Sequence, residues 1–134
     1  MSTVKLLSDE EMAADPQVQA VIDDIKRTRN TEFINNFWRG LANHPDLLET
    51  TWNRLKQVMA PGGALDPLTK ELIYIAVSIT NSCEYCIHSH TASARAKGMT
   101  GAQYQEFLAV VGMAHQTNGL VTGMQITADE EFQN

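Results

Sequence analysis

Apolar residues recur every three to four positions along nearly the whole chain, and no stretch alternates strictly enough for a strand. The clearest interruption, Pro61-Gly62-Gly63-Ala64, is interpreted as a loop between helices, not a domain boundary. The pattern predicts an all-α fold of about six helices in a single domain, residues 1–134. The expected helices run from Ser8 or Pro16 to about Arg29, then about 31–42, 45–60, 67–80, from the cysteine motif to Lys97-Gly98, and about 101–125.

Two of these helices carry faces that need partners. The helix over about 31–42 has an aromatic stripe, including Phe33, Phe37 and Trp38, which favours the core or a subunit interface. The last helix is expected to turn an apolar face inward. His115 on the same stripe is interpreted as a core histidine with a polar partner, with lining of the functional site as the alternative. That inward face comprises Tyr104, Phe107, Leu108, Val111 and Ala114.

Charge and composition narrow the classes of function. The chain has 10 Lys and Arg against 16 Asp and Glu, a formal net charge of −6, which argues against nucleic acid or an anionic membrane as partner. The longest strongly apolar segment, Leu72 to Ile79, is far below the ~20 residues of a membrane span. The N-terminal apolar run is too short for a signal peptide. We therefore expect a soluble protein of the reducing cytoplasm, where two cysteines suit a redox or metal site.

Both cysteines lie in one short motif, Asn81-Ser82-Cys83-Glu84-Tyr85-Cys86-Ile87-His88-Ser89-His90. Asn81 and Glu84 have the spacing of a capping box, so Asn81 is the predicted N-cap, with Cys83 in the first helical turn. A helix N-terminus favours a thiolate there, and the spacing places both sulfurs within disulfide reach. His90 lies four residues after Cys86, and the three groups fall within a sector of about 60°.

Glu71, twelve residues before Cys83, lies at the edge of the apolar stripe of the preceding predicted helix. A carboxylate at that edge is expected to be half-buried, where it could orient His90 and hold its proton. A base beside a thiol is the arrangement that nucleophilic cysteine chemistry requires. The sequence thus predicts a redox dithiol, Cys83 and Cys86, tuned by His90 and Glu71, that needs no cofactor.

Other interpretations of the motif remain open. Cys83, Cys86 and His90 could supply three ligands to a structural zinc ion, although the second Cys/His pair usual in such sites is missing. His88 points about 160° away from Cys86 around the helix, so it is expected at the surface or an interface, with a smaller chance of lining the site. Tyr85 is either a packing residue or an entrance gate.

Taken together, these segments resemble the carboxymuconolactone decarboxylase superfamily, in its alkylhydroperoxidase D-like (AhpD-like) branch. The resemblance covers roughly residues 37–125 and rests on three segments of the sequence. They are Ala42-Asn43-His44-Pro45-Asp46-Leu47-Leu48, Leu65-Asp66-Pro67-Leu68-Thr69-Lys70-Glu71-Leu72, and Cys83 through His90, which fits E-x11-C-x2-C-x3-H counted from Glu71.

The resemblance implies an all-helical homo-oligomer, a trimer or a hexamer, that acts as a thiol peroxidase or disulfide reductase. It assigns Cys86 as the attacking thiol, Cys83 as the resolving thiol, His90 as the base and Glu71 as its partner. It further implies a hydroperoxide or disulfide substrate and a dithiol electron donor, a lipoylated or thioredoxin-like protein.

One position departs from the family pattern, because the AhpD type has a histidine directly before the second cysteine and this chain has Tyr85. Two alternatives to peroxidase activity follow: general disulfide reduction, and a redox-sensing helical module whose dithiol switches its assembly. Decarboxylation of a lactone is not expected, because the decarboxylase branch lacks the cysteine pair.

Overall fold

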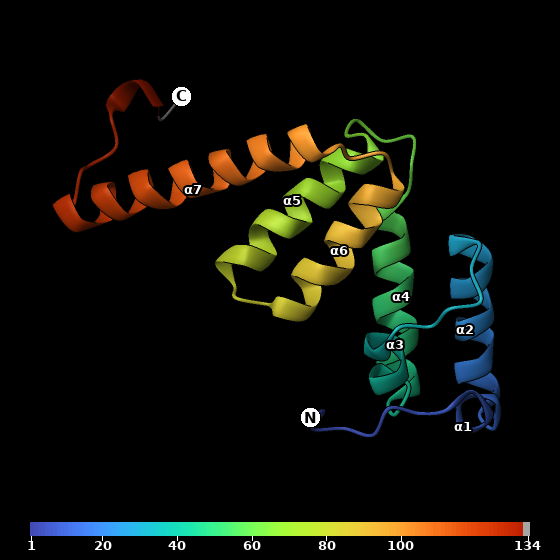
Figure 1. Cartoon of the computed structure of the whole chain (residues 1–134). Coiled ribbons are helices and arrows are strands. Elements are labelled where there is room, and N and C mark those ends of the chain that lie inside the picture. The colour runs from blue at the N-terminus through green and yellow to red at the C-terminus, as the bar shows by residue number, and fades with distance from the viewer. Residues whose placement is uncertain (133–134) are drawn as a thin grey trace. The chain divides into compact units, whose positions relative to one another are not determined.

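A computed structural model describes residues 1–132, and within that range it contains seven α-helices, one short 3₁₀ helix and no strand (Figure 1). The all-α prediction is therefore confirmed. Contacts divide the chain into two compact units, residues 1–60 and 61–134, which are described separately below. The division falls at the Pro61-Gly62-Gly63 loop, and the expectation of one domain over the whole chain stays a prediction.

The N-terminal unit contains α1 (Asp9–Ala13), α2 (Pro16–Arg29), α3 (Asn36–Leu41) and α4 (Pro45–Met59). Both helix starts considered for the first segment are used, because Ser8 forms a capping box with Glu11 and Asp15 caps a new helix that begins at Pro16. The first predicted helix is thus two helices. Asn30 ends α2 in the left-handed conformation, with φ 50°.

The predicted helix over about 31–42 is shorter than expected, because α3 starts only at Asn36. Its aromatic stripe is divided between core and surface: Trp38 is buried, whereas Phe33 is 73% exposed. Trp38 packs edge-on against Trp52 of α4, with ring centroids 5.5 Å apart. The core of this unit comprises Met12, Val18, Val21, Ile22, Ile25, Ile34, Trp38, Ala42, Leu48 and Trp52.

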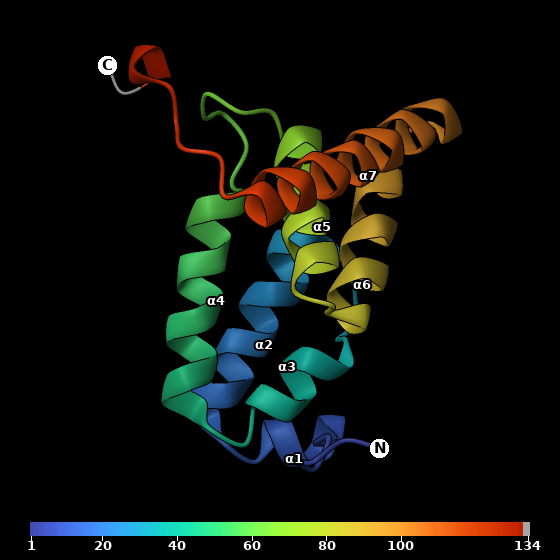
Figure 2. The same cartoon turned by 90° about the vertical axis from the view of Figure 1, so that its left-hand side faces the viewer.

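The C-terminal unit is built on α5 (Pro67–Thr80) and α6 (Glu84–Ala96), which lie side by side in both views (Figures 1 and 2). Asp66 caps α5 ahead of Pro67, as predicted. Gly98 follows α6 with φ 93°, the conformation that favours glycine after a helix end. Between the two helices, Ile75, Ala94 and Met99 form a small buried core.

The last long helix, α7 (Gly101–Met124), begins with a capping box between Thr100 and Gln103 and is followed by a 3₁₀ turn, η1 (Glu130–Phe132). None of its residues is fully buried. On the predicted inward face, Tyr104 and Phe107 pack against the small core and Val111 is partly buried, whereas Leu108 and Ala114 are exposed, so the prediction is wrong for those two. Figure 1 shows α7 extending past the α5–α6 pair. No helix among residues 1–132 is both long and apolar enough to cross a membrane.

Candidate functional site

The turn between α5 and α6 sets where the cysteines lie. Asn81 still belongs to the end of α5, because its backbone N–H donates to the carbonyl of Val77 at 2.9 Å. Ser82 then adopts a left-handed conformation, φ 54°, and the Cys83 N–H returns to the carbonyl of Ser78 at 2.9 Å. The prediction that Asn81 caps the motif helix is therefore wrong, and Cys83 itself occupies the N-cap of α6.

Cys83 and Cys86 are joined by a disulfide, with their Cα atoms 5.3 Å apart. Cys83 Sγ also accepts a hydrogen bond of 3.3 Å from the backbone N–H of Cys86. That N–H is one of the four at a helix start that have no partner within the helix. The first turn of α6 therefore offers a backbone donor and the positive end of the helix dipole to the Cys83 sulfur.

One helical turn beyond Cys86, His90 is held by a carboxylate from α5. His90 Nδ1 lies 2.7 Å from Glu71 Oε2. The Tyr74 ring stacks on the imidazole with centroids 3.7 Å apart and planes 20° from parallel. Glu71 is only 3% exposed, so it is buried and not half-buried as predicted. The His90 side chain is 19% exposed, so its orientation is fixed while solvent still reaches part of the ring.

The other Glu71 oxygen has two partners that sequence reasoning missed. Ser93 Oγ donates to Glu71 Oε1 at 2.8 Å, and Lys97 Nζ lies 2.8 Å from the same oxygen. Lys97 Nζ also donates to Ser93 Oγ at 2.7 Å, which closes a triangle. Cys86, His90, Ser93 and Lys97 are spaced four, three and four residues apart, within a sector of about 60° on one face of α6. That spacing is a signal in the sequence.

Two opposing effects act on the ionisation of Glu71. Burial raises its pKa, but hydrogen bonds from His90, Lys97 and Ser93 and the charge of Lys97 outweigh burial and lower it from 4.5 to about 2. Glu71 is therefore an anion near neutral pH and can only accept hydrogen bonds. Because of this, His90 Nδ1 carries the proton of their shared hydrogen bond, and a neutral imidazole has its lone pair on Nε2.

The depressed pKa of Glu71 predicts a pH-dependent contribution to stability. A carboxyl group with a folded pKa near 2 and an ordinary value of 4.5 stabilises the fold above about pH 5, and this contribution is lost as pH falls towards 2. At about 1.36 kcal/mol per pKa unit, it amounts to at most about 3 kcal/mol. We expect the difference in unfolding free energy between wild type and Glu71→Gln, from urea titrations, to shrink between pH 5 and pH 2. A difference independent of pH would contradict the assignment.

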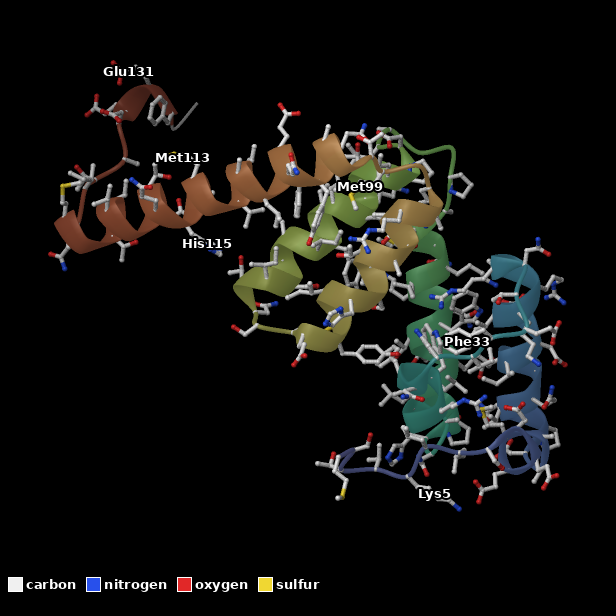
Figure 3. All side chains as sticks on the ribbon, viewed as in Figure 1. Lys5, Phe33, Met99, Met113, His115 and Glu131 are labelled. Atoms are coloured by element: carbon white, nitrogen blue, oxygen red, sulfur yellow. A yellow bond between two sulfur atoms is a disulfide. The ribbon has the colours of Figure 1, made fainter. Side chains whose placement is uncertain are left out.

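The other candidate residues, His88, Tyr85 and His115, are exposed. His88 is 80% exposed at its side chain and lies 4.0 Å from Glu84, one turn earlier on α6. Tyr85 is exposed, on the first turn of α6. His115 is exposed, so the prediction of a core histidine is wrong; its Nε2 lies 3.3 Å from Thr80 Oγ1. Figure 3 shows His115 and Met113 leaving opposite sides of α7.

The structure thus brings together Glu71 and His90 across two helices and joins Cys83 to Cys86. Among residues 1–132, no three His, Cys, Asp or Glu side chains are grouped so that they could hold a metal ion. Chemically, the site is a disulfide at a helix start, followed one turn later by an imidazole bound to a buried anion.

Comparisons with known proteins show what this chain is similar to. A crystal structure of the alkylhydroperoxidase AhpD core from Rhodospirillum rubrum is 61% identical, covers 100% of this chain and 98% of that one, and superposes with a TM-score of 0.98. The alkyl hydroperoxide reductase AhpD of Solibacter usitatus is 36% identical over 92 residues, 69% of this chain and 50% of that protein.

Another relative, uncharacterized protein 4 in the cox locus of Paracoccus denitrificans, is 42% identical over 52 residues, 39% of this chain and 47% of that protein. This chain therefore spans about half the length of the curated relatives it matches. The model of the carboxymuconolactone decarboxylase family matches residues 45–129, which include the whole α5–α6 site. The chain belongs to the carboxymuconolactone decarboxylase family, with the fold of an AhpD core.

Proposed function

We propose that the protein is a thiol-dependent peroxidase that reduces alkyl hydroperoxides with the Cys83–Cys86 dithiol. The observation that carries the proposal is the combination of a disulfide at the start of α6 with His90, one turn later, bound at 2.7 Å to the buried Glu71. The similarity to the AhpD proteins of R. rubrum and S. usitatus supports the same chemistry.

The proposed cycle has three steps. The Cys86 thiolate attacks one oxygen of the hydroperoxide, the O–O bond breaks, and Cys86 becomes a sulfenic acid while the other oxygen leaves as an alkoxide that takes a proton. The Cys83 thiolate then attacks the Cys86 sulfur, which forms the disulfide and releases water after protonation. An external dithiol finally gives two electrons and two protons, restoring both thiols and leaving as a disulfide.

Residues around the dithiol have distinct parts in this cycle. His90 accepts the Cys86 proton at Nε2 and returns it to the leaving alkoxide, since Nδ1 is bound to Glu71. Glu71 fixes the ring and stabilises the imidazolium that forms. The Cys86 N–H at Cys83 Sγ stabilises Cys83 as a thiolate, both when it resolves the sulfenic acid and when it leaves during reduction.

A second candidate is general disulfide reduction without a peroxide. The observation that favours it is Tyr85, which stands directly before Cys86 and is exposed, where the AhpD type has a histidine able to relay protons. Disulfide exchange needs only a thiolate and a leaving thiol, so it proceeds without that relay. Either activity draws electrons from a dithiol donor in a reducing compartment, and we propose a lipoylated or thioredoxin-like protein of the cytoplasm.

The test of the proposal is a peroxide-consumption assay on the reduced protein with cumene hydroperoxide and excess dihydrolipoamide as the dithiol donor. We expect turnover that requires both protein and donor and that leaves the Cys83–Cys86 disulfide when the donor is exhausted. An insulin-reduction assay with the same donor measures the alternative. Disulfide reduction without peroxide consumption would overturn the peroxidase proposal and favour the second candidate.

We further propose that the protein is a homo-oligomer, a trimer or a hexamer, with α7 in the subunit interface. Although α7 has no buried residue, it exposes large apolar side chains: Leu108, Val110, Met113, Leu120, Val121 and Met124. Faces of this kind are usually covered by a partner. Light scattering is expected to give about three or six times the 14.9 kDa chain mass. Leu120→Glu should lower that mass and Asn118→Glu, with the same added charge about 160° away around α7, should not; a monomeric wild type would contradict the proposal.

A further inference from the structure

The buried Glu71 carboxylate has two basic neighbours, Lys97 and His90. Its single negative charge can be balanced by a positive charge on only one of them. Lys97 Nζ and His90 Nδ1 lie 2.8 Å and 2.7 Å from its two oxygens. A buried anion requires one compensating cation. A lysine ammonium beside the Glu71 carboxylate makes a pair without net charge. Compensation of the buried anion therefore does not depend on a charge on His90, which needs only its Nδ1 hydrogen to bind Glu71.

We propose that Lys97 is a positioning residue, which with Ser93 fixes the Glu71 carboxylate and cancels its charge so that His90 stays in its proton-accepting form. This assignment rests on the proposed function, in which His90 is the base. Ser93 holds the geometry because its hydroxyl accepts from Lys97 Nζ at 2.7 Å while it donates to Glu71 Oε1 at 2.8 Å. A single hydroxyl thus binds both charged groups on the side of Glu71 away from His90.

The physical reason is that a lone carboxylate would make a poor partner for a base. An unpaired anion 2.7 Å from an imidazole stabilises the imidazolium, which has no lone pair left to accept a thiol proton. A lysine on the second oxygen reduces the negative field at the ring without removing the hydrogen bond that orients it. The stacked Tyr74 ring from α5 has the opposite effect, because an aromatic face favours a cation.

The groups that contact the His90 ring or its carboxylate partner come from both packed helices, whereas Glu84 and His88 of α6 lie beside one another and Arg95 faces Tyr104. Glu71 on α5 and Lys97 on α6 bind one another, Tyr74 stacks on the ring, and the two cysteines lie one and two turns earlier on α6. In the oxidised protein the cysteines are joined and do not titrate. Of these groups, Glu71 and Tyr74 contact the His90 ring directly, and Lys97 acts on it through Glu71.

NMR titration of the His90 ring in the oxidised protein tests the assignment directly. In Lys97→Met we expect the titration midpoint of His90 to move to higher pH by about one unit, a tenfold gain in proton affinity, because the negative charge of Glu71 is no longer offset. Lys97→Arg should restore the wild-type midpoint, since a guanidinium also binds a carboxylate. Arg95→Met, which removes the same charge from α6 but faces Tyr104 at 5.7 Å, is the matched control and should shift it far less.

Turnover supplies a second readout. In the wild type, the rise of turnover with pH that depends on His90 is the part of the pH profile lost in His90→Ala. In Lys97→Met this rise should occur at higher pH, and in Lys97→Arg it should occur at the wild-type pH. An unchanged His90 midpoint in a folded Lys97→Met protein, or an equal shift in Arg95→Met, would overturn the role of Lys97. Because the NMR titration needs no substrate, a shifted midpoint without any peroxide turnover would instead overturn the peroxidase proposal and leave Lys97 as assigned.

Discussion

Replacing Cys86 by serine is expected to lower peroxide turnover by at least about a thousandfold, because the substitution removes the sulfur that attacks the O–O bond. A serine hydroxyl is far less acidic than a thiol and its oxygen is a much weaker nucleophile towards a peroxide, even with His90 one turn away. The fold should survive, since Cys86 is only partly buried and the core between α5 and α6 is formed by Ile75, Ala94 and Met99.

The Cys83→Ser variant is the matched control for Cys86→Ser. It loses the same disulfide but keeps the attacking thiol, so it should still consume one equivalent of hydroperoxide and accumulate a sulfenic acid that a dimedone probe can trap. Multiple turnover should fail in both variants. A stoichiometric burst in Cys86→Ser, with none in Cys83→Ser, would reverse the two roles. Such a reversal would have a structural explanation, because Cys83 Sγ accepts a hydrogen bond from the Cys86 backbone N–H at the start of α6, and this bond favours a thiolate on Cys83.

Several features of the fold could be predicted from sequence because they depend on local caps. Asp66-Pro67 and Thr100-Gly101 mark the starts of α5 and α7 within a residue, since a side-chain cap followed by a helix former encodes the start locally. The prediction for Asn81 was wrong for a related reason: Asn-x-x-Glu matches a capping box, but Asn81 is the C-cap of α5. The left-handed Ser82 moves the true cap to Cys83, and a residue with positive φ that is not glycine leaves little signal in sequence.

The sequence predicted only part of the candidate site. Glu71 and His90 could be paired because a family pattern relates them, but the burial of Glu71 depends on how closely α6 packs against α5. Ser93 and Lys97 were missed although they continue the stripe of Cys86 and His90, because serine and lysine on a helix are usually read as solvent-exposed. One face of α7 was predicted to be inward because a periodic apolar stripe favours burial, but the stripe does not identify an element of this chain that packs on it.

Removing the His90 imidazole is expected to slow peroxide turnover by a factor of about 10² to 10⁴, the range found for a positioned acid or base. His90→Ala takes away both the acceptor for the Cys86 proton and the donor for the alkoxide. His90→Gln should slow peroxide turnover almost as much, although its amide can still donate a hydrogen bond to Glu71 and keep that carboxylate paired. Failure of both variants would therefore assign the loss to proton transfer and not to an unpaired buried charge.

His88→Ala is the matched control, because it removes a histidine from the same helix whose side chain is 80% exposed and lies 4.0 Å from Glu84. It should retain wild-type turnover. The measurement is the initial rate of hydroperoxide loss across pH 5 to 9, with the oxidised disulfide confirmed in each variant by thiol counting. Equal losses in His88→Ala and His90→Ala would contradict the assignment. Recovery of the His90→Ala rate by added imidazole would support it, since the free base can take the proton that the side chain no longer accepts.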